Sequence, residues 1–296
     1  MGLSTVAVID GRAHIVPEAA GPRRLMWAFR TSRAHVDRTI GAIVELPRGE
    51  AVQDWKPQDA LAIRRFVNLD EADHTVARGK FVLFVDGIRP TAAVFQCNGN
   101  EACRVDCGNA ATAVAAALNA KHGLSKFSYD LTASNGSNIN VDAVVHQDGV
   151  DQVWGIRQEL ALRRLEVGGT VIAEVDFLNL YYIIPASFPI ESLDPVAVAA
   201  PTLRRRVAVI DLSTDPPTAR FRTCGRVHPS APLTGLTILA MAAETVEWLA
   251  PLRRRPTLLI NGIPEALPAV EGSGGAWKIN LPRTECRLRI IGGVQN

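Results

Sequence analysis

The stretch "RVDCGNAATAVAAALNAKHG", residues 104–123, places a cysteine directly before an alanine-rich segment. Residues 109–121 are apolar on almost every helical face, which predicts a buried helix. Cys107 then stands at the helix N-terminus, where unpaired backbone N–H groups and partial positive charge favour an anion. Such a position suits a bound carboxylate or a reactive thiol. The local sequence equally fits a small buried residue that packs under the loop.

A second copy of this pattern lies in the later part of the chain. "PTAAVFQC" begins at Pro90, and "PTARFRTC" begins at Pro217. Laid over one another without a gap, the two segments bring Cys97 onto Cys224, Cys107 onto Thr234 and Gly108 onto Gly235. The second segment leads into another apolar helical stretch, residues 234–250. We interpret this match as an internal duplication.

The remaining patterning is dominated by short strands rich in valine, isoleucine and aromatic residues, bounded by Gly, Asn, Asp or Pro. Residues 57–69 instead predict a surface helix. Together with the repeat, this predicts an α+β fold of two pseudo-symmetric halves. Each half would be a curved, mostly antiparallel sheet or barrel around a central buried helix. The expected halves are 1–187 and 188–296, with a Pro- and Ala-rich linker near 185–206 and the active site in the cleft between them.

Composition limits the classes of partner. The formal net charge of the 296 residues is +2, which gives no reason to expect nucleic acid or a membrane surface as partner. No signal peptide and no long uninterrupted apolar stretch is apparent. The five cysteines fit neither a disulfide framework nor a zinc-ligand pattern. We therefore expect a cytoplasmic protein with reduced thiols and no metal.

The segment "DCGNAATAVAAALNAKHGL" resembles the signature of the 2-methylaconitate cis-trans isomerases and methylitaconate Δ-isomerases, the PrpF-like family. This family shares the diaminopimelate epimerase-like fold. Weaker matches follow in family order: "TSR" at 31–33, "KFVLF" at 80–84, "FQC" at 95–97, "SNGSN" at 134–138, "GRVHPSAPLTGLTILAMAA" at 225–243 and "PRTECRL" near the C-terminus.

The resemblance implies a cofactor-independent allylic proton transfer on a small unsaturated di- or tricarboxylic acid. It assigns the acid/base roles to Lys80 and Cys107. Helix-end amides at four residues would hold the carboxylates and the enolate-like intermediate; they are Gly108, Asn109, Thr234 and Gly235. The further substrate-binding candidates are Thr31, Ser32, Arg33 and His228. The implied partner is a small-molecule carboxylic acid, with a homodimer as an expected assembly.

Several alternatives stay open at this stage. Lys80 also fits a solvated strand edge, Arg33 a surface arginine, and His228 a loop histidine without a role. The segment "MWAFRTSRAH", residues 26–35, lacks the glycines of the family's corresponding loop, and "NGIPEA" replaces its His-Pro-Ser-Gly stretch.

Two other functions remain possible on the same fold. A cofactor-independent amino-acid racemase or epimerase would need two opposed thiols, whereas Thr234 stands at the second helix end and Cys224 lies earlier. A catalytically inactive binding or scaffold protein is favoured by the altered loop at 26–35 and opposed by the presence of both Lys80 and Cys107.

Overall fold

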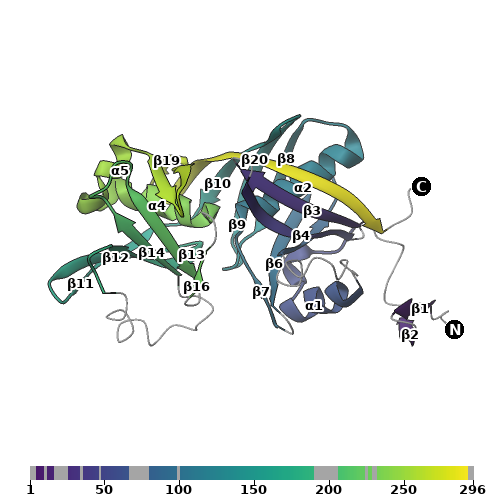
Figure 1. Cartoon of the computed structure of the whole chain (residues 1–296). Helices are drawn as coiled ribbons and strands as arrows, with labels where there is room; N and C mark the ends of the chain where they lie inside the picture. Colours follow the sequence, from purple (N-terminus) through teal and green to yellow (C-terminus); the bar gives the residue numbers. More distant parts are fainter. Residues whose placement is uncertain are drawn as a thin grey trace.

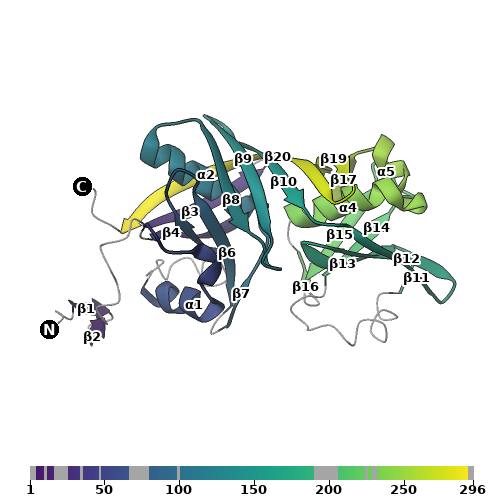
Figure 2. The same ribbon diagram turned by 180° about the vertical axis from the view of Figure 1, so that it is seen from behind.

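The computed structural model describes residues 5–9, 12–16, 26–33, 36–46, 48–66, 80–98, 101–189, 206–223, 226–228 and 232–292. Its helices are α1 (Pro57–Phe66), α2 (Gly108–His122), α4 (Leu233–Thr245) and α5 (Pro251–Arg254), with the 3-10 turns η1 (Val52–Asp54) and η5 (Glu247–Leu249). A small hairpin joins β1 (Thr5–Ile9) to β2 (Arg12–Val16). In both views (Figures 1 and 2), the two larger sheets lie side by side.

The first sheet closes into a barrel. Its strands are β3 (Met26–Arg33), β4 (Val36–Leu46), β5 (Lys80–Val85), β6 (Thr91–Asn98), β7 (Glu101–Arg104), β8 (Lys126–Thr132), β9 (Asn138–His146), β10 (Gly149–Arg157), β19 (Ala269–Ser273) and β20 (Ala276–Gly292). They run in the order β10-β9-β8-β6-β5-β4-β3-β20-β19, with β7 on β6. A further pairing between β10 and β20 closes the ring.

The second sheet is curved and repeats the topology of the first. Its strands are β11 (Ala161–Val167), β12 (Thr170–Phe177), β13 (Asn179–Pro185), β14 (Arg206–Asp211), β15 (Thr218–Thr223), β16 (Arg226–Val227), β17 (Thr257–Ile260) and β18 (Ile263–Ala266). The order is β11-β12-β13-β14-β15-β17-β18, with β16 on β15. Parallel pairs stand at matching places, β4–β5 and β6–β8 in one sheet and β13–β14 and β15–β17 in the other.

Matching hydrogen bonds support the duplication that the sequence predicts. The carbonyl of Pro90 accepts from the backbone of Asp130 at 2.9 Å, and that of Pro217 accepts from Leu259 at 2.8 Å. Pro90 directly precedes β6 and Pro217 precedes β15. Each bond connects this point to the strand that follows the central helix of the same half, β8 or β17. The two repeat prolines therefore occupy equivalent positions in the two halves.

The two central helices lie in the core, as the sequence predicts. α2 is buried from Gly108 to Leu118 and contacts β3, β4 and β20. α4 is buried from Leu233 to Ala243 and contacts β12 and β13. Alanine at many of these positions lets the strands approach the helix axis closely. One continuous apolar cluster includes residues of both helices, so the two halves share a core.

The sheets divide the chain differently from the predicted boundary at 187/188. β11–β13 precede that boundary yet belong to the second sheet, whereas β19 and β20 return to the first. The predicted linker, 185–206, joins β13 to β14, which are parallel neighbours within the second sheet. Residues 190–205 of that segment lie outside the described residues. Proline and alanine mark a connection in the sequence, but they do not reveal which strands it connects.

The first turns of the two helices correct the register of the repeat. Cys107 precedes α2, and Ala111 donates to its carbonyl at 2.9 Å. Pro232 holds the same place before α4, and Leu236 donates to its carbonyl at 2.9 Å. The structural counterpart of Cys107 is thus Pro232 and not Thr234. The ungapped comparison missed this because the segments leading into the two helices differ in length.

Within the described residues, no single helix is long and apolar enough to cross a membrane. α4 and residues 247–254 pass that test together by length and composition only, with a bend of 113° between them.

Candidate active site

The N-termini of the two central helices meet. A Cβ added at Gly108 would lie 2.8 Å from Leu233 Cδ1, so the first residues of α2 and α4 are in contact. Among the described residues, no side chain caps either helix. The first backbone N–H groups of a helix have no intrahelical acceptor, and here two such sets lie close together. Positive partial charge therefore gathers at the junction of the two halves.

The first turn of α2 is held in place by β10. Gln152 donates from Nε2 to the Gly108 carbonyl at 3.2 Å and to Thr112 Oγ1 at 2.6 Å. Trp154 in turn donates to Gln152 Oε1 at 3.2 Å. All three side chains are buried. These bonds fix the position of the helix end relative to the barrel wall.

Lys80 faces the helix side of the barrel. In β5, Val82 and Phe84 pack into the core around α2, whereas Phe81 and Leu83 pack on the opposite face, under α1. The alternation of a strand puts Lys80 with Val82 and Phe84. The surface lysine weighed in the sequence analysis is therefore not what the structure shows.

The surroundings of Lys80 favour its neutral amine. Burial is the largest influence and lowers the pKa of Lys80 below its ordinary value, and the nearby Arg206 lowers it further. Cys107, Cys103 and Asp106 act in the opposite direction. Lys80 donates a hydrogen bond to Gln96 on β6. Lys80 thus lies within electrostatic range of Cys107.

Cys107 is half-buried at the start of α2. Its Sγ lies 4.0 Å from Thr39 Oγ1 on β4. The next residue but one, Asn109, is 4% exposed, and its side-chain oxygen has no hydrogen-bond partner among the described residues. This oxygen is a buried acceptor whose hydrogen-bonding capacity is not satisfied by the described residues.

Asp106 links the barrel to the second sheet. Its carboxylate accepts from Ser134 N at 2.7 Å, from Ser134 Oγ at 2.6 Å and from Asn179 Nδ2 at 2.9 Å. Burial raises the pKa of Asp106, while these bonds and the positive charge of Arg206 oppose the rise. Sequence analysis missed Asp106, although it directly precedes Cys107.

Arg206, the first residue of β14, completes this network. It donates a hydrogen bond to Asn179, and its Cζ lies 5.9 Å from the centre of the Tyr181 ring. Tyr181 is buried and hydrogen-bonds to Thr234 in the first turn of α4. Burial raises the pKa of Tyr181, so this phenol stays protonated. Sequence analysis also missed Arg206, which stands in the run Arg204-Arg205-Arg206.

The three candidates at 31–33 lie in a strand and not in a loop, and they point to different sides. Thr31 is fully buried and donates to the Thr39 carbonyl at 3.3 Å. Ser32 lies on the opposite face and donates to Glu285 at 3.0 Å. Arg33 forms an ion pair of 3.5 Å with Glu265 on β18, and both side chains are 5% exposed. Arg33 is thus paired with a carboxylate of the protein itself.

The candidates of the second half lie around the start of α4. Thr234 and Gly235 are buried in its first turn, and a Cβ at Gly235 would lie 2.8 Å from the Phe221 ring. His228 follows β16, and its backbone donates to the Phe221 carbonyl at 2.7 Å. Cys224 lies outside the described residues.

Comparison with known proteins rests on structure alone, because no family model and no curated protein sequence matches the chain. A PhzF-family phenazine biosynthesis protein of Bacillus anthracis is similar, with a TM-score of 0.55, 10% identity, and coverage of 92% of this chain and 99% of the other. A predicted epimerase of Pseudomonas aeruginosa gives 0.52 at 14% identity, covering 89% and 97%. A probable proline racemase of Agrobacterium radiobacter gives 0.52 at 14%, covering 92% of both chains. The chain has the diaminopimelate epimerase-like fold.

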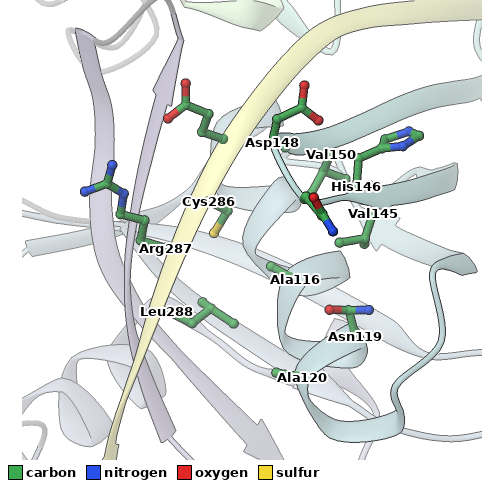
Figure 3. A pocket seen from close by; sticks show the side chains of 13 residues that line it. Ala116, Asn119, Ala120, Val145, His146, Asp148, Val150, Cys286, Arg287 and Leu288 are labelled. Atoms are coloured by element: carbon green, nitrogen blue, oxygen red, sulfur yellow. The ribbon is translucent and has the colours of Figure 1, made fainter.

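The structure also has a pocket away from Lys80 and Cys107. The pocket has a volume of about 490 Å³ and lies between α2, the β9–β10 turn and β20 (Figure 3). Its lining includes Ala116, His146 and Cys286, and none of the residues predicted for the site. Burial raises the pKa of the Cys286 thiol to about 12. Among the described residues, no cluster of three or more His, Cys, Asp or Glu side chains is placed to hold a metal ion.

Proposed function

We propose that this protein is a cofactor-independent isomerase that moves a proton between carbon atoms of a small unsaturated di- or tricarboxylic acid. Lys80 and Cys107 are the acid/base pair. The PrpF-like resemblance suggests an alkyl-aconitate-, itaconate- or maleate-like substrate. The similarity to proteins described as an epimerase and a racemase supports an isomerase in general terms.

One observation carries the proposal. A half-buried lysine with a lowered pKa lies within electrostatic range of a cysteine at a helix N-terminus, and the N-terminus of the second central helix lies against it. A general base must be neutral to accept a proton near neutral pH, and burial favours that form of Lys80. The helix-end N–H groups offer donors for the carboxylates of an enolate-like intermediate.

The proton transfer balances with these two groups alone. The neutral amine of Lys80 takes a proton from the carbon next to the double bond and becomes an ammonium group. The electron pair spreads over the allyl system into the carboxylate. The Cys107 thiol gives its proton to the far carbon, and the resulting thiolate stands at the positive helix end. Passage of the proton from Lys80 back to Cys107 restores the starting state.

An amino-acid racemase is the second candidate, favoured by the nature of the structural neighbours. A two-thiol mechanism would need a cysteine at both helix ends. The residue that precedes α4 is Pro232, which has no proton to exchange. This observation favours the lysine–cysteine pair.

Proton NMR in deuterated water tests the proposal. The panel contains alkylated aconitates, itaconates and maleates, together with proline and hydroxyproline. We expect deuterium uptake at an allylic carbon with the wild-type protein, and its loss in both Cys107→Ser and Lys80→Ala. Uptake at the α-carbon of an amino acid would replace the proposal with a racemase, and no uptake from any compound would favour a binding protein.

A further inference from the structure

Lys80 and Arg206 occupy the same position in the two halves. Each is the first residue of an equivalent strand, β5 in the barrel and β14 in the second sheet. Lys80 is paired with Gln96 on β6, and Arg206 is paired with Thr223 on β15. Counted from the prolines of the repeat, Gln96 and Thr223 stand at the same place. The duplication therefore puts one cationic residue from each half at corresponding sites.

Both side chains point to the shared core side of their sheets. In β14, Ala208 and Ile210 pack in the cluster that includes α2 and α4, whereas Val207 and Val209 pack on the other face. Strand alternation puts Arg206 with Ala208 and Ile210. Its effect on the pKa of Lys80 shows that the two cations are within electrostatic range of each other.

The guanidinium group of Arg206 is oriented but not neutralised. Asn179 and the Tyr181 ring hold it, and among the described residues no carboxylate lies within ion-pair distance of it. The charge of Arg206 lowers the pKa of Asp106, but the Asp106 carboxylate accepts hydrogen bonds from Ser134 and Asn179. Arg33, by contrast, is paired with Glu265 in a buried contact.

We propose that Arg206, and not Arg33, binds a carboxylate of the substrate opposite Lys80. The identity of the ligand as a carboxylic acid rests on the function proposed above. Arginine keeps its charge under all ordinary conditions and pairs with a carboxylate through two parallel hydrogen bonds. An arginine cannot accept the substrate proton, because its guanidinium group stays protonated. The two equivalent positions therefore have different roles: Lys80 transfers the proton and Arg206 binds the carboxylate.

The test measures binding separately from turnover. Ligand-observed NMR compares itaconate and 2-methylmaleate with their amides, which lack the negative charge. The wild-type protein is expected to prefer each acid over its amide. Arg206→Gln should weaken acid binding at least about tenfold and leave amide binding nearly unchanged, because a charge-assisted bidentate contact is lost. Arg206→Lys keeps the positive charge but cannot form two parallel hydrogen bonds to a carboxylate, so it should give an intermediate loss of acid binding.

Arg220→Gln is the matched control, since Arg220 is an exposed arginine on β15. It should keep the wild-type preference. If Arg33→Gln abolishes the preference while Arg206→Gln and Arg206→Lys keep it, the assignment is overturned. A wild-type protein that binds acid and amide equally also overturns it. If the acids bind through Arg206 but exchange no deuterium, the isomerase proposal fails and the binding assignment stands. Circular dichroism identifies any variant that does not fold. If Arg206→Gln does not fold, the acid preference of Arg206→Lys is the measurement that tests the assignment.

Discussion

Gly108 at the start of α2 lies directly against Leu233 at the start of α4. An added Cβ would come within 2.8 Å of Leu233 Cδ1 and 3.1 Å of Leu281 Cδ1. A side chain at position 108 would thus separate the two helix ends. The absence of a side chain there brings both sets of N–H groups close together, which the proposed function requires if both are to bind one ligand.

Gly108→Ala should therefore reduce activity more than stability. The clash with Leu233 costs about 1–3 kcal/mol, and the higher helix propensity of alanine offsets up to about 1 kcal/mol of it. We expect a melting temperature within a few degrees of wild type and at least about a tenfold loss of deuterium exchange. Gly87→Ala is the control, because an added Cβ there meets nothing within 4 Å. Equal activity of the two variants would contradict a functional contact between the helix ends.

Lys80→Met should change the pH dependence of stability. The pKa of Lys80 is lowered in the folded protein, so between that pKa and the unfolded value of 10.5 the unfolded chain binds more protons. The free energy of unfolding of the wild type should then rise with pH across this window relative to Lys80→Met. Urea titrations at several pH values measure the difference. Exposed Lys126→Met is the control, and wild-type and Lys80→Met curves that run parallel would show that the pKa of Lys80 is not lowered in the folded protein.

The Arg33–Glu265 pair should show strong coupling between its two residues. Arg33→Leu alone leaves a buried carboxylate without its cation and should cost about 3–5 kcal/mol. The double variant Arg33→Leu/Glu265→Leu should recover most of that loss, since both charges are gone. Urea denaturation of the four proteins in the cycle gives the coupling energy. Additive losses would mean that the two side chains do not interact.

Arg255→Leu provides the comparison for this cycle. Arg255 contacts Asp215 at 3.4 Å, but both side chains are exposed, at 57% and 79%. Water and salt screen such a pair, so its removal should leave the denaturation midpoint nearly unchanged.

Cys286 should react slowly with alkylating reagents. With its pKa raised to about 12 by burial, on the order of one thiol in ten thousand is ionised at pH 8. Iodoacetamide should label Cys286 at least about 100-fold more slowly than it labels glutathione, as followed by peptide mass spectrometry. In urea the same peptide should react at the rate of a free thiol. Rapid labelling in the folded state would show that the pocket lined by Cys286 leaves the thiol ionisable.

Sequence analysis predicted the parts of the fold that repeat. The two apolar helices and the prolines Pro90 and Pro217 fixed the duplication, because both copies of a buried helix need small residues on every face. The same patterns predicted Cys107 at a helix end. They did not predict that β19 and β20 return to the first sheet, because strand propensity carries no information about long-range pairing.

The candidate site was only partly predictable for a related reason. Lys80 and Cys107 came from a resemblance that follows chain order. Arg206 lies near Lys80 only because two halves that are distant in sequence pack together, and Asp106, although next to Cys107, shows its contact with Asn179 only when the second sheet is in place. A useful signal was present nonetheless: laid over the first half with the strand register of the structure, the repeat puts Arg206 on Lys80. The ungapped comparison hid that match, because Lys80 lies ten residues before Pro90 whereas Arg206 lies eleven residues before Pro217.

The long strand β20 has a consequence for synthesis. It spans 17 residues and pairs with β3, β10 and β19, yet it follows the whole of the second sheet in sequence. A ribosome makes about 5–20 residues per second, so the barrel strands wait many seconds for the strand that completes them. During that interval the edges of β3 and β10 are open to pairing with other chains. The first half of the protein to be translated is therefore the last to be finished, and its nascent form is the state with unpaired strand edges.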